Sequence, residues 1–274
     1  MTTPMPAPPT EAELRSVNNT RRFASGRVVL ALVLREMVTT YGRSPGGYIW
    51  AILEPVAGIA LLTAVFSIAF RSPPLGTNFA IFYAAGIVPY MAYMNVSAKL
   101  AQALSFSKQL IAYPAVTFVD ALAARFILEF MTQLLVGYLL MTGILLVYDT
   151  QTAPNLPEIA LGYAMVGALA IGIGTLNCFI ATMFPVWQRI WAIMNRPLML
   201  ISCVLFTYES VPEPYRGYLW YNPLVHVVGQ MRRGFYPYYD AVYVSAGYVF
   251  GVSLVLTLFG MVFLFRYNRD LLNM

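Results

Sequence analysis

Long apolar runs separated by short polar segments make up most of the chain, and they predict helices that cross a membrane. A helix needs roughly 20 apolar residues to span the hydrocarbon core of a bilayer, and several runs reach that length. A shorter apolar run at about 28–41 is interrupted by Arg35 and Glu36. Its charged and apolar side chains fall on different helix faces, so we expect an amphipathic helix on the membrane surface. The spans are predicted at about 48–70, 79–98, 116–147, 159–184, 190–208 and 242–265.

The composition agrees with this pattern. Hydrophobic residues make up 59% of the 274-residue chain and charged residues only 11%, whereas soluble domains carry about 25% charged residues. We therefore expect an all-α, polytopic membrane protein of about six transmembrane helices, with one transmembrane domain over 27–274. Residues 1–26 are rich in proline and polar residues and lack the apolar core of a signal peptide, which predicts a disordered cytoplasmic tail.

The distribution of basic residues predicts the orientation. The formal net charge of +5 does not require a nucleic-acid partner, because the basic residues lie beside the apolar runs. Most of the 17 lysines and arginines fall on one side of the membrane if both termini are cytoplasmic, and cytoplasmic loops carry such an excess. We therefore expect cytoplasmic termini, a cytoplasmic loop at about 99–115 and an outer segment at about 209–241.

The outer segment at about 209–241 is too long for a turn and is rich in tyrosine. Asn222 can cap a helix whose first turn holds Pro223, and apolar residues follow at helical spacing. Aromatic rings favour the depth of the lipid headgroups. These features predict a short re-entrant helix that dips into the outer leaflet before the last span. Two interpretations stay open: the segment lines the outer mouth of a pathway, or it only anchors the protein at the membrane surface.

Charged residues inside apolar runs usually face protein or water, because lipid solvates them poorly. Glu54 lies near the start of the first span, and Arg43 just before it is the expected partner. Arg125 and Glu129 are four residues apart in the third span, which predicts an ion pair along one helix face. A structural role and contact with a transported molecule stay open for these groups. His226, the only histidine, has no acidic neighbour in the sequence, which favours a hydrogen-bonding role over proton transfer.

The residues offer no sign of metal or nucleotide chemistry. One histidine and two cysteines cannot form a zinc cluster, and Cys178 and Cys203 fall in predicted spans as small packing residues. No G-x-x-x-x-G-K-[ST] motif occurs, so the chain has no loop of the kind that cradles ATP phosphates. We expect no catalytic residue, no metal and no cofactor in this chain. Any ATP, with its Mg²⁺, would be bound by a partner.

Several stretches resemble the membrane subunits of ABC-2 type exporters. TTYGRSPGGYIWAILEPVAGIALLTAVF, residues 39–66, is similar to the start of their first span. YNPLVHVVGQMRRGFY, residues 221–236, is similar to the Asn-Pro-Leu-Xaa-His element before their last span. The stretch RIWAIMNRPLMLISCVLFTYESVPEPYRGYLWYNPL, residues 189–224, is most similar to the branch that exports capsular polysaccharide. The Pro45-Gly46 pair departs from the Arg-Leu that is common in the family.

The resemblance implies a homodimer in the bacterial inner membrane that binds two copies of a separate ATP-binding ABC subunit. It implies that this complex moves lipid-linked acidic polysaccharide across the membrane, and that periplasmic and outer-membrane export proteins carry the polymer onward. An O-antigen or teichoic acid exporter is the nearest alternative. An ion-coupled secondary transporter is less favoured, because the carboxylates lie near helix ends and no internal repeat is visible. A membrane glycosyltransferase would need paired acids that the chain lacks.

The resemblance also suggests functional residues. The loop at about 99–115 matches the place of the family's coupling helix, so Leu104, Phe106, Leu110 and Tyr113 are expected to dock on the ATPase, with a plain cytoplasmic loop as the alternative. Arginine and aromatic rings suit an acidic glycan, because arginine binds carboxylates bidentately and rings stack on sugar faces. A purely anchoring or packing role stays open. The expected substrate path consists of Tyr41, Arg43, Glu54, Tyr221, His226, Arg232, Arg233 and Tyr236.

Overall fold

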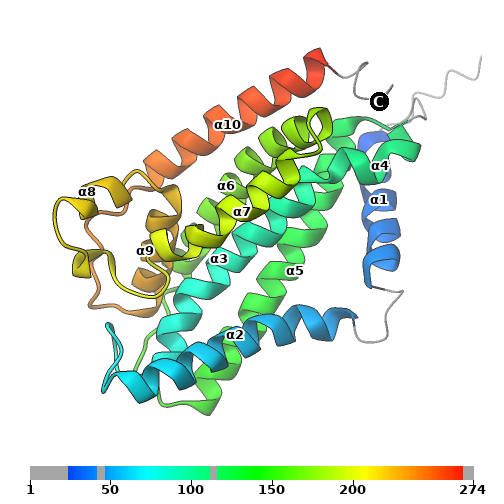
Figure 1. Cartoon of the computed structure of the whole chain (residues 1–274). Coiled ribbons are helices and arrows are strands. Elements are labelled where there is room, and N and C mark those ends of the chain that lie inside the picture. The colour runs from blue at the N-terminus through cyan, green and yellow to red at the C-terminus, as the bar shows by residue number, and fades with distance from the viewer. Residues whose placement is uncertain (1–23, 42–46, 112–115, 268–274) are drawn as a thin grey trace, which may run out of the picture.

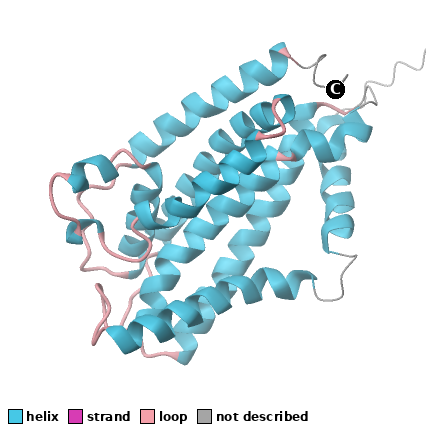
Figure 2. Ribbon diagram, viewed as in Figure 1, coloured by secondary structure: helices cyan, strands magenta, loops and turns pink. Residues whose placement is uncertain are grey.

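A computed structural model describes residues 24–41, 47–111 and 116–267, and the regular elements in these ranges are all helical (Figure 1, Figure 2). This confirms the predicted all-α class. The interfacial helix expected at 28–41 is part of the longer helix α1. The helices are α1 (Ala24–Tyr41), α2 (Gly47–Ala69), α3 (Phe79–Ala101), α4 (Ala103–Ile111), α5 (Phe118–Val147), α6 (Leu156–Met183), α7 (Trp187–Ile201), α8 (Tyr215–Leu219), α9 (Pro223–Phe235) and α10 (Ala246–Arg266), with a 3-10 turn η2 (Tyr208–Ser210).

Five of the described helices, α2, α3, α5, α6 and α10, are long and apolar enough to cross a membrane. Each corresponds to one of the predicted spans. The span expected at 190–208 differs, because α7 has only 15 residues. At 1.5 Å per residue it is about 22 Å long, and the hydrocarbon core is about 30 Å thick. The chain leaves the helix after Ile201, and residues 202–207 continue in irregular backbone.

Helix α3 occupies the centre of the bundle and is the most buried of the five long helices. It packs against α2, α5, α6 and α9 (Figure 1). Small residues of α6 set the distance to its neighbours: a Cβ atom at Gly174 would lie 2.6 Å from Leu100 Cβ of α3, and one at Gly172 would lie 2.7 Å from the Ser253 carbonyl oxygen of α10. Such small residues let helices approach closely in a membrane, where packing drives association.

Helices α1 and α4, the start of α5 and the end of α10 lie at one end of the bundle (Figure 1). The ring of Phe118, at the start of α5, lies edge-on to Phe265 near the end of α10, with centroids 4.8 Å apart. Arg35 of α1 lies 5.8 Å from the centre of the Phe106 ring of α4. We call this the α4 end. Helices α8 and α9 lie at the opposite end, the α9 end (Figure 1).

Candidate functional site

The segment expected to dock on a partner forms helix α4 at the α4 end. Ala103, Leu104 and Ser107 are buried against the bundle and anchor the helix. Leu104 therefore packs within its own chain, which corrects its prediction as an exposed docking residue. Phe106 is 42% exposed and remains available on the surface of α4. The side chain of Leu110 and all of Tyr113 lie outside the described residues.

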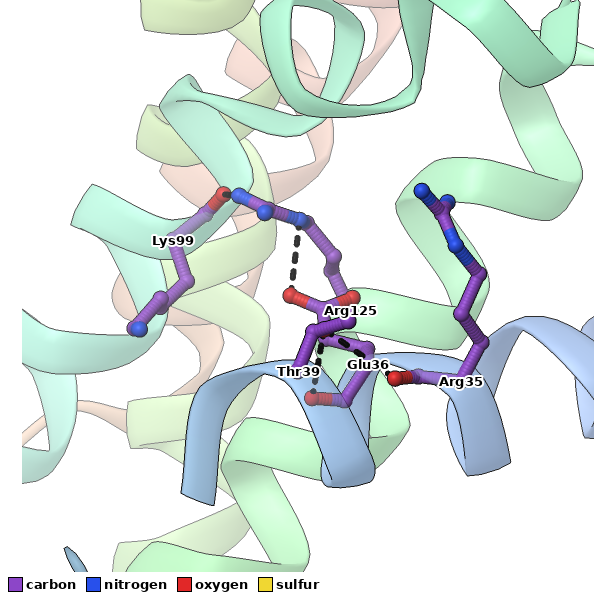
Figure 3. A network of polar contacts seen from close by, with 5 residues as sticks. All are labelled: Arg35, Glu36, Thr39, Lys99 and Arg125. Carbon is purple, nitrogen blue, oxygen red and sulfur yellow. Dashed lines mark hydrogen bonds and ion pairs between the residues drawn. The ribbon is translucent and has the colours of Figure 1, made fainter. Parts of the chain in front are cut away.

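A buried ion pair joins α1 to α5 beside this helix (Figure 3). Arg125 Nε lies 2.9 Å from Glu36 Oε1, with side-chain exposures of 5% and 9%. Arg125 Nη1 also donates a 2.8 Å hydrogen bond to the Lys99 carbonyl oxygen in the last turn of α3. The predicted pairing of Arg125 with Glu129 is wrong, because Arg125 pairs with Glu36 and Glu129 accepts a hydrogen bond from Gln133 Nε2 at 2.9 Å. Tertiary packing supplies a closer partner than the same helix does.

The environment of Glu36 makes its charge depend on that arginine. Burial raises the pKa of the Glu36 carboxyl, and the Arg125 guanidinium opposes the rise. Glu36 is also the only buried side chain among those described in α1. The face of Phe106 then covers the same guanidinium, with Arg125 Cζ 4.2 Å from the ring centre. One arginine therefore touches α1, α3 and α4 from its place on α5.

At the α9 end, α9 begins as the sequence predicts. The Asn222 side chain accepts a 3.0 Å hydrogen bond from the Leu224 N–H, and Pro223 is the first helical residue. Of residues 224–236, only Arg233 is exposed. Both interpretations of the outer segment need correction for α9, because protein covers this helix almost completely. It is neither a surface anchor nor an open lining, since its apolar face and most of its polar groups pack on neighbouring helices.

His226 illustrates this packing. The Ser245 backbone N–H can only donate, so His226 Nδ1 accepts that bond at 3.1 Å. The hydrogen then resides on Nε2, which donates to the Trp220 carbonyl oxygen at 2.8 Å. Burial lowers the pKa of the imidazole. A buried, neutral ring with both nitrogens engaged is a structural residue, which supports the hydrogen-bonding role and removes His226 from the predicted path.

Arg232 is also a structural residue, contrary to its predicted place at a wet outer mouth. Its side chain is fully buried. Nη1 donates to the Phe206 carbonyl oxygen and Nη2 to the Val204 carbonyl oxygen, both at 2.8 Å. Its Cζ lies 4.4 Å from the ring centre of Phe82 on α3. Irregular backbone inside a membrane protein needs internal hydrogen-bond partners, and Arg232 provides two of them for the segment after α7.

The remaining predicted outer residues divide by exposure. Arg233 is 47% exposed, and its Nη2 lies 3.4 Å from Glu158 Oε1 at the start of α6. Tyr221 is exposed as well. Tyr236 is buried, and a Cβ atom on Gly76 would lie only 2.6 Å from its ring. Only Arg233 and Tyr221 can therefore meet a molecule outside the chain, and Tyr236 is corrected to a packing residue.

Helix α7 presents polar groups that the sequence interpretation missed. None of its residues is buried within the chain. Arg189 and Arg196 are both exposed, and their spacing of seven residues places them on one helix face. The seven-residue spacing of the two arginines is visible in the sequence, but the apolar run 190–208 resembles a span.

The predicted residues near the start of α2 are only partly described. Glu54 on α2 is exposed. Arg43 and the Tyr41 side chain, the expected inner partners, lie outside the described residues.

An aromatic cavity lies between the C-terminal part of α2, α3 and the segment after α7. Its volume is about 540 Å³, and its lining includes Phe66, Phe79, Tyr83 and Phe206. The carbonyl of Phe206 is the one that Arg232 holds. Arg232 thus positions one wall of this cavity. Aromatic faces of this kind can stack on sugar rings or hold apolar chains.

Exposed charged groups on a bundle of apolar helices indicate faces that protein or water would cover. In the described residues, no group of three or more histidine, cysteine, aspartate or glutamate side chains could hold a metal ion. The chain belongs to the ABC-2 type transporter family, whose model matches residues 27–236.

Curated relatives cover most of the chain. The polysialic acid transport protein KpsM of Escherichia coli is 32% identical over 242 residues, which are 88% of this chain and 93% of KpsM. The capsule polysaccharide export inner-membrane protein BexB of Haemophilus influenzae is 26% identical over 89% of this chain and 92% of BexB. CtrC of Neisseria meningitidis serogroup A, which has the same description, is 23% identical over 89% of this chain and 92% of CtrC.

Proposed function

We propose that this chain is the membrane-spanning subunit of an ATP-driven exporter that moves lipid-linked acidic capsular polysaccharide across the bacterial inner membrane. The observation that carries the proposal is the extent of the similarity. KpsM, BexB and CtrC each align with about nine tenths of the chain, and their names refer to polysialic acid transport or capsule polysaccharide export. The subunit itself would not be an enzyme, since ATP and Mg²⁺ would be held by the partner ATPase.

The exposed arginines support an acidic substrate. Arg189 and Arg196 share one uncovered face of α7, and Arg233 is half exposed at the α9 end. Guanidinium groups bind carboxylates and phosphates bidentately, and exposed contacts are weak enough to release a moving polymer. Together with Tyr221 and the aromatic cavity, these residues are our revised candidates for the substrate path.

A homodimer would explain the uncovered faces of α2 and α7. Glu54 is exposed on an apolar helix, and an intramembrane carboxylate is expected to face protein or water, because lipid solvates it poorly. We propose that a second copy and the water-filled pathway between the copies cover these faces. Two copies of an ATP-binding subunit would dock on α4, where Phe106 is exposed, and this end would face the cytoplasm with both termini. Periplasmic and outer-membrane export proteins would receive the polymer.

Complementation of a capsule-export mutant tests the proposal. The host keeps capsule synthesis but lacks its own inner-membrane permease, and this chain is expressed with a candidate P-loop ATPase. We expect polysaccharide to appear at the cell surface and the intracellular pool to decline. The control is the same pair with the P-loop lysine of the ATPase replaced, which should restore no export. Intracellular polymer that persists although both proteins accumulate and co-purify would contradict the proposed substrate.

A further inference from the structure

Glu36, Arg125 and Phe106 form a junction between three helices at the α4 end. Arg125 extends from α5, pairs with Glu36 of α1 at 2.9 Å and bonds the Lys99 carbonyl oxygen of α3 at 2.8 Å. Figure 3 shows the Arg125 and Glu36 side chains pointing toward each other between their helices. The ring of Phe106 covers the guanidinium at 4.2 Å. Neighbouring charges are Lys99, Glu129 and Arg35.

Helices α1 and α4 both contact this arginine of α5. Helix α1 packs along α5, and Glu36 is the only buried side chain among those described in α1, so the ion pair with Arg125 helps to fix the position of α1. Phe106 is on the surface of α4, yet its ring face rests on the same guanidinium. A displacement of α4 therefore changes the contact at Arg125, and a movement of Arg125 either moves Glu36 or breaks the ion pair.

A buried ion pair is a poor device for stability alone. Well-packed apolar residues often serve as well or better, because the charges lose their hydration. The pair does fix one relative position of the two helices, since a displaced partner leaves a buried charge uncompensated. Such a contact has two distinct states, engaged and broken, which is what transmission between two sites requires.

We propose that Glu36, Arg125 and Phe106 are positioning residues that transmit movement of α4 to α1, and so couple the ATPase to the transmembrane helices. The inference rests on the proposed function, because it takes α4 as the docking helix. A movement of α4 displaces the Phe106 ring on Arg125, and the change at Arg125 acts on its ion pair with Glu36 of α1. Helix α1 precedes α2 in the sequence, and the exposed face of α2 is a candidate wall of the pathway.

The measurement that tests this role is polysaccharide exported per ATP hydrolysed by the permease–ATPase complex in membrane vesicles. Glu36→Gln should leave the ATPase co-purified and hydrolysis active, and should lower the ratio by fivefold or more, since coupling between sites is typically worth about 5- to 150-fold. Glu213→Gln is the matched control, because Glu213 belongs to an exposed ion pair with Arg216 at 3.8 Å. That variant should keep the wild-type ratio. A wild-type ratio in Glu36→Gln would overturn the proposal.

Two further variants separate coupling from plain structural support. The double change Glu36→Leu with Arg125→Met replaces the ion pair by apolar residues and should keep accumulation of the complex at the wild-type level while still lowering the ratio. Phe106→Leu keeps an apolar side chain for docking but removes the ring from the guanidinium, and it should also lower the ratio. Full export per ATP in the apolar double variant would show that the pair is only a clamp, and the proposal would fail. A wild-type complex that binds no ATPase or exports no polymer would instead refute the proposed function.

Discussion

Arg232 Nη2 donates a 2.8 Å hydrogen bond to the Val204 carbonyl oxygen, and so a helix at the α9 end holds the irregular backbone that follows α7. The close approach of α3 completes this arrangement, because a Cβ atom at Gly86 would lie only 2.9 Å from the same oxygen. Specific contacts with α9 and α3 therefore stabilise the irregular backbone that ends the short helical segment at 187–207. The Val204 and Phe206 carbonyl oxygens within it are paired with Arg232 inside the protein.

The first prediction concerns Arg232. Arg232→Gln should destabilise the protein by about 2–5 kcal/mol, because it leaves backbone carbonyls without their charged donor in a buried site. The measurement is the thermal midpoint and yield of the detergent-solubilised protein. Arg232→Lys should recover only part of the loss, since one ammonium cannot reproduce the guanidinium fork. Normal yield and midpoint in both variants would show that the two bonds contribute nothing.

Arg233 should behave differently although it is the next residue. Its ion pair with Glu158 is half exposed at 3.4 Å, and such pairs contribute about 1 kcal/mol or less. Arg233→Gln should therefore leave the thermal midpoint nearly unchanged and reduce export of an acidic polymer moderately. Arg233→Glu should reduce export further, because it repels the polymer. Equal export by both variants and wild type would remove Arg233 from the substrate path.

Two residues of α4 allow a comparison between a buried packing residue, Leu104, and an exposed docking residue, Phe106. Leu104→Ala should cost about 2–5 kcal/mol, as expected for a buried leucine, and should lower accumulation of the protein. Phe106→Ala should accumulate normally but lose most of the co-purifying ATPase, because Phe106 is exposed. Both quantities can be read from one affinity purification. If Phe106→Ala retains the ATPase at the wild-type level, docking occurs elsewhere on the chain.

Membrane sidedness can be measured with an impermeant thiol reagent. Cys178 and Cys203 are buried, so the wild-type background should be low. Cysteines at the exposed positions Thr77 and Ala153 should react from the periplasm, and one at the exposed Ser105 should react only after the membrane is opened. The pattern follows from placing the α4 end in the cytoplasm. Labelling of Ser105→Cys in intact cells would reverse the orientation.

His226 predicts a dependence of stability on pH. Burial lowers the pKa of the folded imidazole, whereas the unfolded side chain titrates near about 6.5. The unfolded state therefore binds more protons below that pH, so stability is full above about 6.5 and declines as the pH falls below it. The thermal midpoint should fall between pH 7.5 and pH 5, and His226→Gln should flatten the decline. An identical decline in that variant would assign it to other groups.

The long apolar runs predict α2, α3, α5, α6 and α10 well, because about 20 apolar residues have few alternatives to a buried or membrane-spanning helix. The cap at Asn222 is equally local and equally predictable. The partners of Arg125 and Arg232 are not, because they lie far away in the sequence. Glu36 is 89 positions before Arg125, and the nearer Glu129 satisfies the local rule for helix pairs without making the contact. His226 and Arg232 were predicted to line the path, but in the structure their side chains form hydrogen bonds with backbone groups inside the bundle.

The bonds made by Arg232 have an evolutionary consequence. The guanidinium recognises main-chain oxygens of residues 204 and 206, and these oxygens are present whatever side chains occupy the two positions. Substitutions at Leu205 and Phe206 that keep an apolar character can therefore accumulate without breaking the contact, whereas a change at position 232 breaks both bonds at once. Among members of the family, the segment after α7 should drift in sequence and so vary the wall of the aromatic cavity, while the arginine that supports it persists.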